Sequence, residues 1–128
     1  MAPAQRLHGI RVLVVDDNAD QLTIMRDVLA HAGASVETAR SAQEAFDAFQ
    51  GAPHDVVISD LAMPQATGYS LIRRIRKSPW YASIPAIAMT AYSEVEHRAK
   101  ALDAGFNEWL AKPATAEVVD LVATLVGR

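Results

Sequence analysis

The 128-residue sequence contains no cysteine, which excludes a disulfide framework and any chemistry that depends on a thiolate. Basic residues are not in excess either: the formal net charge is −3, so we expect no direct binding to nucleic acid. No apolar run approaches the length of a membrane span, and residues 1–9 lack the apolar segment of a signal peptide. We therefore expect a cytoplasmic protein that does not insert into a membrane.

The composition is that of an ordinary globular domain. Hydrophobic residues make up 51% of the chain and charged residues 21%. A chain of this length is long enough for one sizeable core. We expect a loose leader over residues 1–9 and a single domain over residues 10–128, with no output domain.

Five short segments of the chain, each bounded by polar or turn-forming residues, predict strands. The run of β-branched apolar residues in Asp55–Asp60 is typical of a strand that is buried on both faces. The five predicted strands lie at Ile10–Val15, Ser35–Ala39, Asp55–Asp60, Ile84–Met89 and Trp109–Ala111.

A segment with apolar residues at helical spacing follows each run, which predicts five amphipathic helices. Capping signals support three of them: Ser41 with Glu44, Ser93 with Glu96, and Thr115. The third helix is expected over about Tyr69–Lys77. The predicted inner faces are Leu22, Met25, Val28, Leu29 and Ala32; Ala42, Ala45, Phe46 and Phe49; Leu71, Ile72 and Ile75; Val95, Ala99 and Leu102; and Val118, Val122 and Leu125.

Strand and helix therefore alternate five times. This alternation predicts the α/β class, with a parallel sheet covered by helices on both faces. Because crossovers between parallel strands are right-handed, a doubly wound three-layer sandwich is the favoured architecture. In such sheets ligands collect at the carboxyl edge.

Polar residues stand at the carboxyl ends of four predicted strands. Asp16 and Asp17 follow the first strand, Asp60 ends the third, and Thr90 and Lys112 follow the fourth and fifth. Taken singly, each has an ordinary structural role as a helix cap, a turn hydroxyl or a surface charge. Because all five point to one edge, we interpret them together as a site.

Phosphoryl transfer onto a carboxylate is the chemistry that this set suits. Clustered carboxylates repel one another, and Mg²⁺ relieves the repulsion while keeping the acceptor ionised. An ionised Asp60 is a competent nucleophile for forming an acyl phosphate. Lys112 supplies a second positive charge, and the Thr90 hydroxyl can donate to a phosphoryl oxygen.

The ordered motifs resemble the receiver domain of two-component response regulators over about Ile10 to Val126. The resemblance rests on Asp16-Asp17-Asn18, Asp60 with Met63-Pro64 and Gly68, Thr90-Ala91, and Lys112-Pro113. It implies a flavodoxin-like sheet with strand order 2-1-3-4-5.

The resemblance also implies a role for each site residue. Asp60 would be the phosphoacceptor and would bind Mg²⁺ together with Asp17, the backbone carbonyl of Ala62 and, largely through water, Asp16. Lys112 would contact the phosphoryl group.

A second group of residues would transmit the signal, again by resemblance. Thr90 would move toward the phosphoryl group, and Trp109 holds the position of the switch aromatic. The Lys112-Pro113 peptide bond would be cis.

The implied partner is a histidine kinase or a histidine phosphotransfer domain. Phosphorylation would alter the surface of the fourth helix, fifth strand and fifth helix for a downstream protein that the sequence does not identify. We expect a monomer or a weak, phosphorylation-linked dimer. The segment Leu7–Asn18 looks more like the receivers of hybrid kinases than those of transcription factors, but a stand-alone regulator stays open.

The chain departs from the commonest family pattern at Trp109, where Tyr or Phe is usual, and at Ala62, which has no polar side chain. Because Ala62 cannot orient an attacking water and Tyr92 is bulky enough to cover the site, we expect a long-lived phosphoryl group.

The sequence is also compatible with two other functions. A phosphatase of the haloacid-dehalogenase type uses similar residues, but its nucleophile lies in an Asp-x-Asp motif after the first strand. A flavodoxin-like cofactor binder would have a hydroxyl- and glycine-rich loop where Asp16 and Asp17 stand. We expect no enzyme activity beyond promotion of the protein's own phosphorylation and dephosphorylation.

Overall fold

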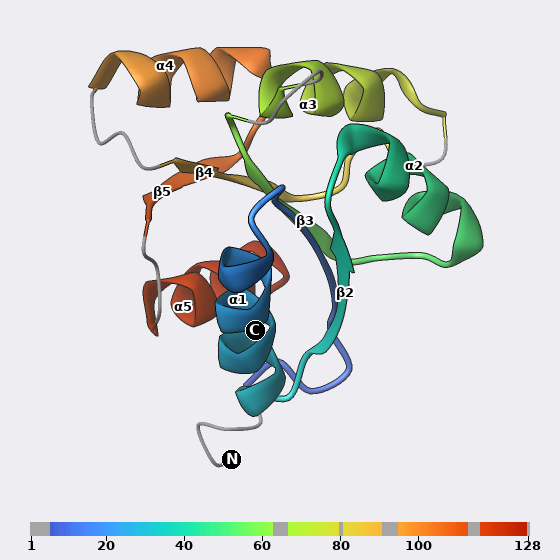
Figure 1. Cartoon of the computed structure of the whole chain (residues 1–128), viewed down its shortest axis with the longest axis vertical. Helices are drawn as coiled ribbons and strands as arrows, with labels where there is room; N and C mark the ends of the chain where they lie inside the picture. The colour runs from blue at the N-terminus through green and yellow to red at the C-terminus, as the bar shows by residue number, and fades with distance from the viewer. Residues whose placement is uncertain (1–5, 63–66, 80, 91–94, 113–115, 128) are drawn as a thin grey trace.

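The computed structural model describes residues 6–62, 67–79, 81–90, 95–112 and 116–127 (Figure 1). Strands and helices alternate five times, as predicted. They are β1 (Arg11–Val15), α1 (Ala19–His31), β2 (Ser35–Ala39), α2 (Ala42–Gly51), β3 (Val56–Asp60), α3 (Gly68–Lys77), β4 (Ala86–Thr90), α4 (Val95–Ala104), β5 (Glu108–Ala111) and α5 (Ala116–Leu125).

The five strands form one parallel sheet in the order β2-β1-β3-β4-β5. Helices α1 and α5 cover one face, and α2, α3 and α4 cover the other (Figure 1). This three-layer arrangement confirms the flavodoxin-like fold that the sequence predicted. Because every strand runs in the same direction, all five carboxyl ends lie along one edge of the sheet.

The core explains why the apolar runs form strands. Successive side chains of a strand point to opposite faces. Leu13 and Val57 accordingly pack beneath α2 and α3, whereas Val12 and Ile58 pack against α1 and α5. In β3 and β4 every residue is buried, which confirms that their apolar runs belong to the centre of the sheet.

The expectation of a loose leader is wrong for residues 6–9. Leu7 is fully buried in the cluster shared by α1, α5 and the sheet, and its N–H donates to the Ala32 carbonyl at 2.8 Å. Arg6 pairs with Asp120 on α5. A single apolar residue has no periodicity, so its burial was not visible in the sequence pattern.

The predicted inner face of α4 is also wrong. Ala99 is exposed and Leu102 is 41% exposed, whereas Ala101 is fully buried. Helix α4 meets the core through small residues, and its larger apolar residue is turned outward. The side chain of Val95 and the capping signals at Ser93 and Thr115 lie outside the described residues.

The other four helices form where the sequence predicts them, and their predicted inner faces are buried or half-buried. Asn18, Ser41 and Thr67 cap α1, α2 and α3 with side-chain oxygens that accept backbone N–H groups. The predicted apolar faces of α2 and α3 are buried in full, and α5 buries Val118 and Val122. Leu125 is half-buried against the same core.

Arg76 joins three segments that lie far apart in the sequence. Its guanidinium donates to the carbonyls of Gly105, Ala82 and Ile84 at 2.9, 2.9 and 2.6 Å, and to Asn107 Oδ1 at 2.9 Å. The side chain therefore ties α3 to the turns that precede β4 and β5, and so fixes the entry of both strands into the sheet.

Replacing Arg76 with Met is expected to lower the free energy of unfolding by ~2–3 kcal/mol, because three backbone carbonyls lose a charged donor. Urea unfolding followed by circular dichroism measures the change. Arg73→Met is the matched control, since Arg73 is exposed on the same helix. Equal effects of the two substitutions would contradict a stabilising role for the Arg76 contacts.

Candidate functional site

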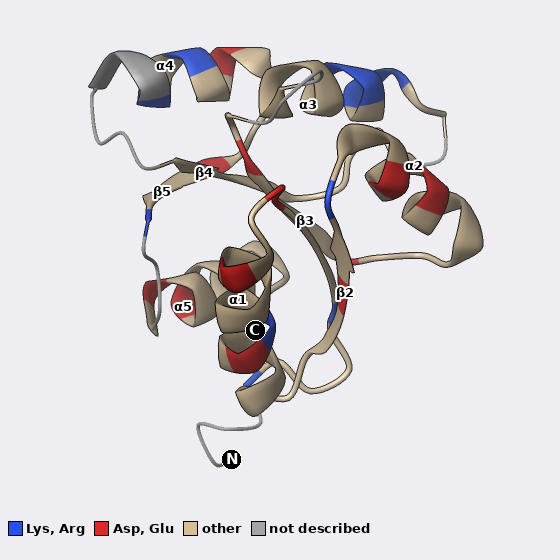
Figure 2. Ribbon diagram, in the orientation of Figure 1, with Lys and Arg blue, Asp and Glu red and all other residues tan. Residues whose placement is uncertain are grey.

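The carboxyl edge of the sheet brings together the three aspartates that the sequence singled out. Asp16 and Asp17 follow β1, and Asp60 is the last residue of β3. One carboxylate oxygen from each lies within 4.8 Å of the other two. Asp16 and Asp60 are buried, and Asp17 is the more open of the three. The acidic ends of β1 and β3 lie side by side in Figure 2.

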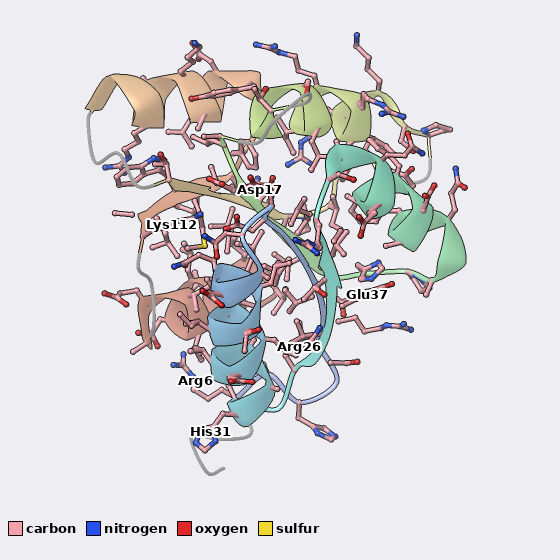
Figure 3. The ribbon with its side chains drawn as sticks, in the orientation of Figure 1. Arg6, Asp17, Arg26, His31, Glu37 and Lys112 are labelled. Carbon is pink, nitrogen blue, oxygen red and sulfur yellow. The ribbon has the colours of Figure 1, made fainter. Side chains whose placement is uncertain are left out.

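Lys112, just after β5, reaches across the edge to these carboxylates. Its Nζ lies 2.6 Å from Asp16 Oδ2 and 3.3 Å from Asp60 Oδ2. The lysine side chain is 15% exposed, so both ion pairs are largely shielded from water. Figure 3 labels Lys112 and Asp17 at this edge of the sheet. The ammonium therefore offsets part of the repulsion between the aspartates.

Backbone groups also hold the two buried carboxylates in place. The Asn18 N–H donates to Asp16 Oδ1 at 3.0 Å, and the Ala62 N–H donates to Asp60 Oδ1 at 3.3 Å. Each aspartate thus has one oxygen fixed by the loop that follows its strand and the other oxygen near Lys112. The carboxylates are oriented before any ligand arrives.

Burial and ion pairing shift the pKa values of Asp60 and Lys112 in opposite directions. Burial raises the pKa of Asp60, Lys112 lowers it and Asp16 raises it, and the net direction is upward. Burial alone would lower the pKa of Lys112, but its hydrogen bond with Asp16 and the charges of Asp60 and Asp16 raise it. Lys112 therefore keeps its positive charge.

The three aspartates fit a magnesium ion. Mg²⁺ prefers carboxylate oxygens in an octahedral shell at about 2.1 Å, which places ligand atoms roughly 3 to 4 Å apart. The oxygens of Asp16, Asp17 and Asp60 are already close to that spacing. Ala62 is exposed beside them, and the structure records its N–H on Asp60, whereas the role of its carbonyl remains a prediction.

Thr90 and Trp109 lie on the neighbouring strands. Thr90 ends β4, is 1% exposed, and accepts the Lys112 backbone N–H on its carbonyl at 2.8 Å. Trp109 in β5 is half-buried against the core, and its buried indole N–H has no hydrogen-bond partner among the described residues. The predicted cis peptide bond at Pro113 and the predicted covering of the site by Tyr92 concern residues outside the described ranges.

A comparison with protein families identifies this arrangement. The model of the response regulator receiver domain matches residues 12–124. The chain belongs to the response regulator receiver family. This membership confirms the family resemblance and places the protein among the receivers of two-component systems.

Curated relatives of this receiver differ widely in length. It is 40% identical over 119 residues to an uncharacterized 14.6 kDa protein of Leptolyngbya boryana, and covers 91% of it. It is 35% identical to the transcriptional regulatory protein TrcR of Mycobacterium tuberculosis, but covers 44% of that protein. It is 32% identical to the sensor histidine kinase RcsC of Escherichia coli, of which it covers 12%. These matches cover 92%, 92% and 89% of the receiver itself.

Solved structures resemble this receiver over nearly its whole length. A putative response regulator from Chloroflexus aurantiacus superposes with a TM-score of 0.87 at 29% identity, covering 93% of this chain and 98% of the other. The chemotaxis response regulator CheY4 of Vibrio cholerae gives 0.82 at 32% identity, covering 91% and 98%. In the described part of this receiver, no helix has the length and apolar character needed to cross a bilayer.

Gly68 supports the site in a way that the sequence analysis missed. It opens α3, and its N–H donates to the Leu61 carbonyl at 3.1 Å. A Cβ at Gly68 would lie 2.3 Å from the backbone oxygen of Asp60, so only glycine lets α3 approach the end of β3 this closely. The glycine was visible as a turn signal, but the close contact depends on the tertiary structure.

Gly68→Ala is expected to lower the free energy of unfolding by about 2 kcal/mol or more, because α3 must move away from Asp60. Gly51→Ala is the matched control: a Cβ at Gly51 meets no atom within 4 Å, and this helical position favours alanine. Chemical unfolding of both variants tests the contact. A Gly68→Ala protein as stable as the Gly51→Ala protein would contradict it.

Asp60→Asn is expected to stabilise the receiver at pH 7 in the absence of divalent cations. Because the folded-state pKa of Asp60 is raised above 3.8, the folded protein holds this proton more tightly than the unfolded chain does. Ionisation of Asp60 therefore lowers the free energy of unfolding as the pH rises from 3.8 through the raised pKa. The gain from asparagine should shrink as the pH falls through the raised pKa.

Urea unfolding at a series of pH values measures this difference. Asp27→Asn, at an exposed position of α1, controls for the loss of one negative charge. Equal stability of the Asp60→Asn and wild-type proteins at every pH would show that Lys112 fully offsets the burial of Asp60, contrary to the expected direction.

Proposed function

We propose that this receiver accepts a phosphoryl group on Asp60 from the phosphohistidine of a histidine kinase or a histidine phosphotransfer domain. The observation that supports this most is the convergence of Asp16, Asp17 and Asp60, whose carboxylate oxygens lie within 4.8 Å of one another, with Lys112 paired to two of them. Such a set lowers the energy of a transferring phosphoryl group mainly by positioning it and neutralising its charge.

The proposed step exchanges one phosphorus bond for another. A carboxylate oxygen of Asp60 attacks phosphorus, the P–N bond to the histidine breaks, and its electrons leave with the imidazole, which is then protonated. The product on this chain is an acyl phosphate. The backbone bond from Ala62 to Asp60 Oδ1 leaves the other oxygen, Oδ2, on the side of Lys112.

Asp16, Asp17 and Asp60 would hold Mg²⁺, with the Ala62 carbonyl as a further ligand. When bound, the ion supplies positive charge that neutralises phosphoryl oxygens and keeps Asp60 ionised near neutral pH. Lys112, whose Nζ lies 3.3 Å from Asp60 Oδ2, would neutralise further negative charge. Because burial alone disfavours the Asp60 carboxylate, both cations favour the nucleophilic form.

We also propose that Thr90 and Trp109 couple phosphorylation to the α4-β5-α5 surface. Thr90 is buried next to the site, and its carbonyl is bonded to the backbone of Lys112, so the ends of β4 and β5 are linked. A phosphoryl group that binds better to one arrangement of these residues shifts the population toward it. This receiver would then signal by binding a partner, with no turnover of an external substrate.

Phosphorylation by acetyl phosphate tests the proposal directly. Intact-protein mass spectrometry is expected to show one phosphoryl adduct that forms only with Mg²⁺ and is absent from Asp60→Asn. Asp27→Asn is the matched control and should be modified like the wild type. An adduct on the Asp60→Asn protein, or none on the wild type with Mg²⁺ bound, would refute Asp60 as the acceptor.

A further inference from the structure

A pocket of 580 Å³ lies beside the carboxyl end of α2, at the other edge of the sheet from Asp60. Its lining includes Phe49, Gly51, Pro53, His54 and Tyr81. Residues 49–54 precede β3, so the pocket stands at the amino edge of the sheet, whereas the aspartates stand at the carboxyl edge. Any ligand of this pocket is separate from the phosphoryl chemistry.

Aromatic rings form one wall of the pocket. Phe49 and Tyr81 are stacked with centroids 4.6 Å apart, and His54 meets Phe49 edge-on at 5.5 Å. Phe46 continues this group, with its ring 6.4 Å from Phe49 and 6.3 Å from Tyr81. The negative faces of aromatic rings attract cations, with guanidinium groups among the best suited.

The same aromatic group already binds one guanidinium. Arg74 Cζ lies 3.8 Å from the centroid of the Phe46 ring. At the other end of the group, where Tyr81 and Phe49 line the pocket, the described lining residues include no Lys or Arg. The two ends therefore offer similar rings, and among the described residues Arg74 covers the Phe46 ring while no Lys or Arg lines the pocket at the other end.

The electrostatics of α2 add to this asymmetry. Helix α2 carries Glu44 and Asp47 and no basic residue (Figure 2). Residues at its negative carboxyl end line the pocket. The last turn of α3, in contrast, contains three basic residues. Beside the pocket, His54 Nε2 lies 2.8 Å from the half-exposed carboxylate of Glu37. The end of α2 and the aromatic rings therefore favour a positively charged ligand in the pocket.

We propose that this pocket binds the guanidinium group of an arginine side chain from a partner protein. A planar guanidinium can stack on Tyr81 while its N–H groups donate to the carbonyls that end α2. An ammonium group has the charge but not the planar shape, so arginine fits better than lysine. The site is independent of Asp60, so it adds a second contact surface to the receiver.

N-acetylarginine amide is the first probe, with N-acetylcitrulline amide as an uncharged control of nearly the same shape. Titration of the ¹⁵N-labelled wild type should give saturable NMR shifts around Gly51, His54 and Tyr81 with the arginine compound only. Equal shifts with both compounds, or arginine shifts confined to the aspartate edge, would overturn the proposal. Tyr81→Leu should weaken binding about two- to fivefold, because the ring face is lost and the apolar bulk is kept.

Gly51 offers a matched pair of variants, since a side chain there meets no atom within 4 Å. Gly51→Lys places a cation of this chain at the end of α2 and should abolish binding of the arginine probe. Gly51→Gln has similar length without charge and should still bind it. The lysine variant should also melt at a higher temperature than the glutamine variant. Indistinguishable binding and melting of the two variants would show that the pocket does not select positive charge.

The source of the guanidinium is tested by comparing methylguanidinium with a glycine-flanked arginine peptide. Tighter binding of the peptide, lost in Gly51→Lys, supports docking of a partner protein. If methylguanidinium binds as tightly as the peptide, the ligand is a small molecule and the assignment to a protein partner is wrong.

Discussion

The ion pairs of Lys112 with Asp16 and Asp60 are the constraint on which the rest of the structure depends. Both carboxylates are buried, and buried charges of one sign are costly unless an opposite charge is close. The lysine follows β5, an edge strand, while the carboxylates follow β1 and β3 in the middle of the sheet. In this strand order the lysine side chain reaches past the end of β4, at Thr90, to both carboxylates.

The buried charge of Asp60 lowers the stability of the folded protein, and the apolar centre of the sheet offsets this cost. Burial raises the pKa of Asp60, which means that the folded protein disfavours the charge that Asp60 would need as the proposed phosphoacceptor. Strand β3, which ends at Asp60, and its neighbour β4 are buried at every position. Gly68 also lets α3 pack against the backbone oxygen of Asp60. Buried apolar strands and the close approach of α3 thus hold the backbone of Asp60 in place.

Local patterns predicted the layers of the fold and the meeting of Asp16, Asp17, Asp60 and Lys112. Apolar runs and helix caps are patterns of a few neighbouring residues, so they are visible in the sequence. Because the strands are parallel, residues at their carboxyl ends then meet at one edge of the sheet. The sequence could not predict contacts made by single residues with distant partners. Arg76 lies four residues after the buried Ile72, on the core side of α3, but its partners near residues 82–84 and 105–107 become neighbours only in the folded chain. Leu102 was misplaced because small residues such as Ala101 suit either face of a helix.

The buried indole N–H of Trp109 indicates how much free energy the proposed switch could involve. A buried donor without a partner costs about 1–3 kcal/mol, and the indole N–H has none among the described residues. Coupling free energies between sites are typically of the same size, about 1–3 kcal/mol. An arrangement that gives the indole N–H a partner would recover an energy sufficient to change the population of β5 states. Compared with Phe, the tryptophan at this position adds a hydrogen-bond donor, and in the proposed switch a partner for this donor would favour one of the two states.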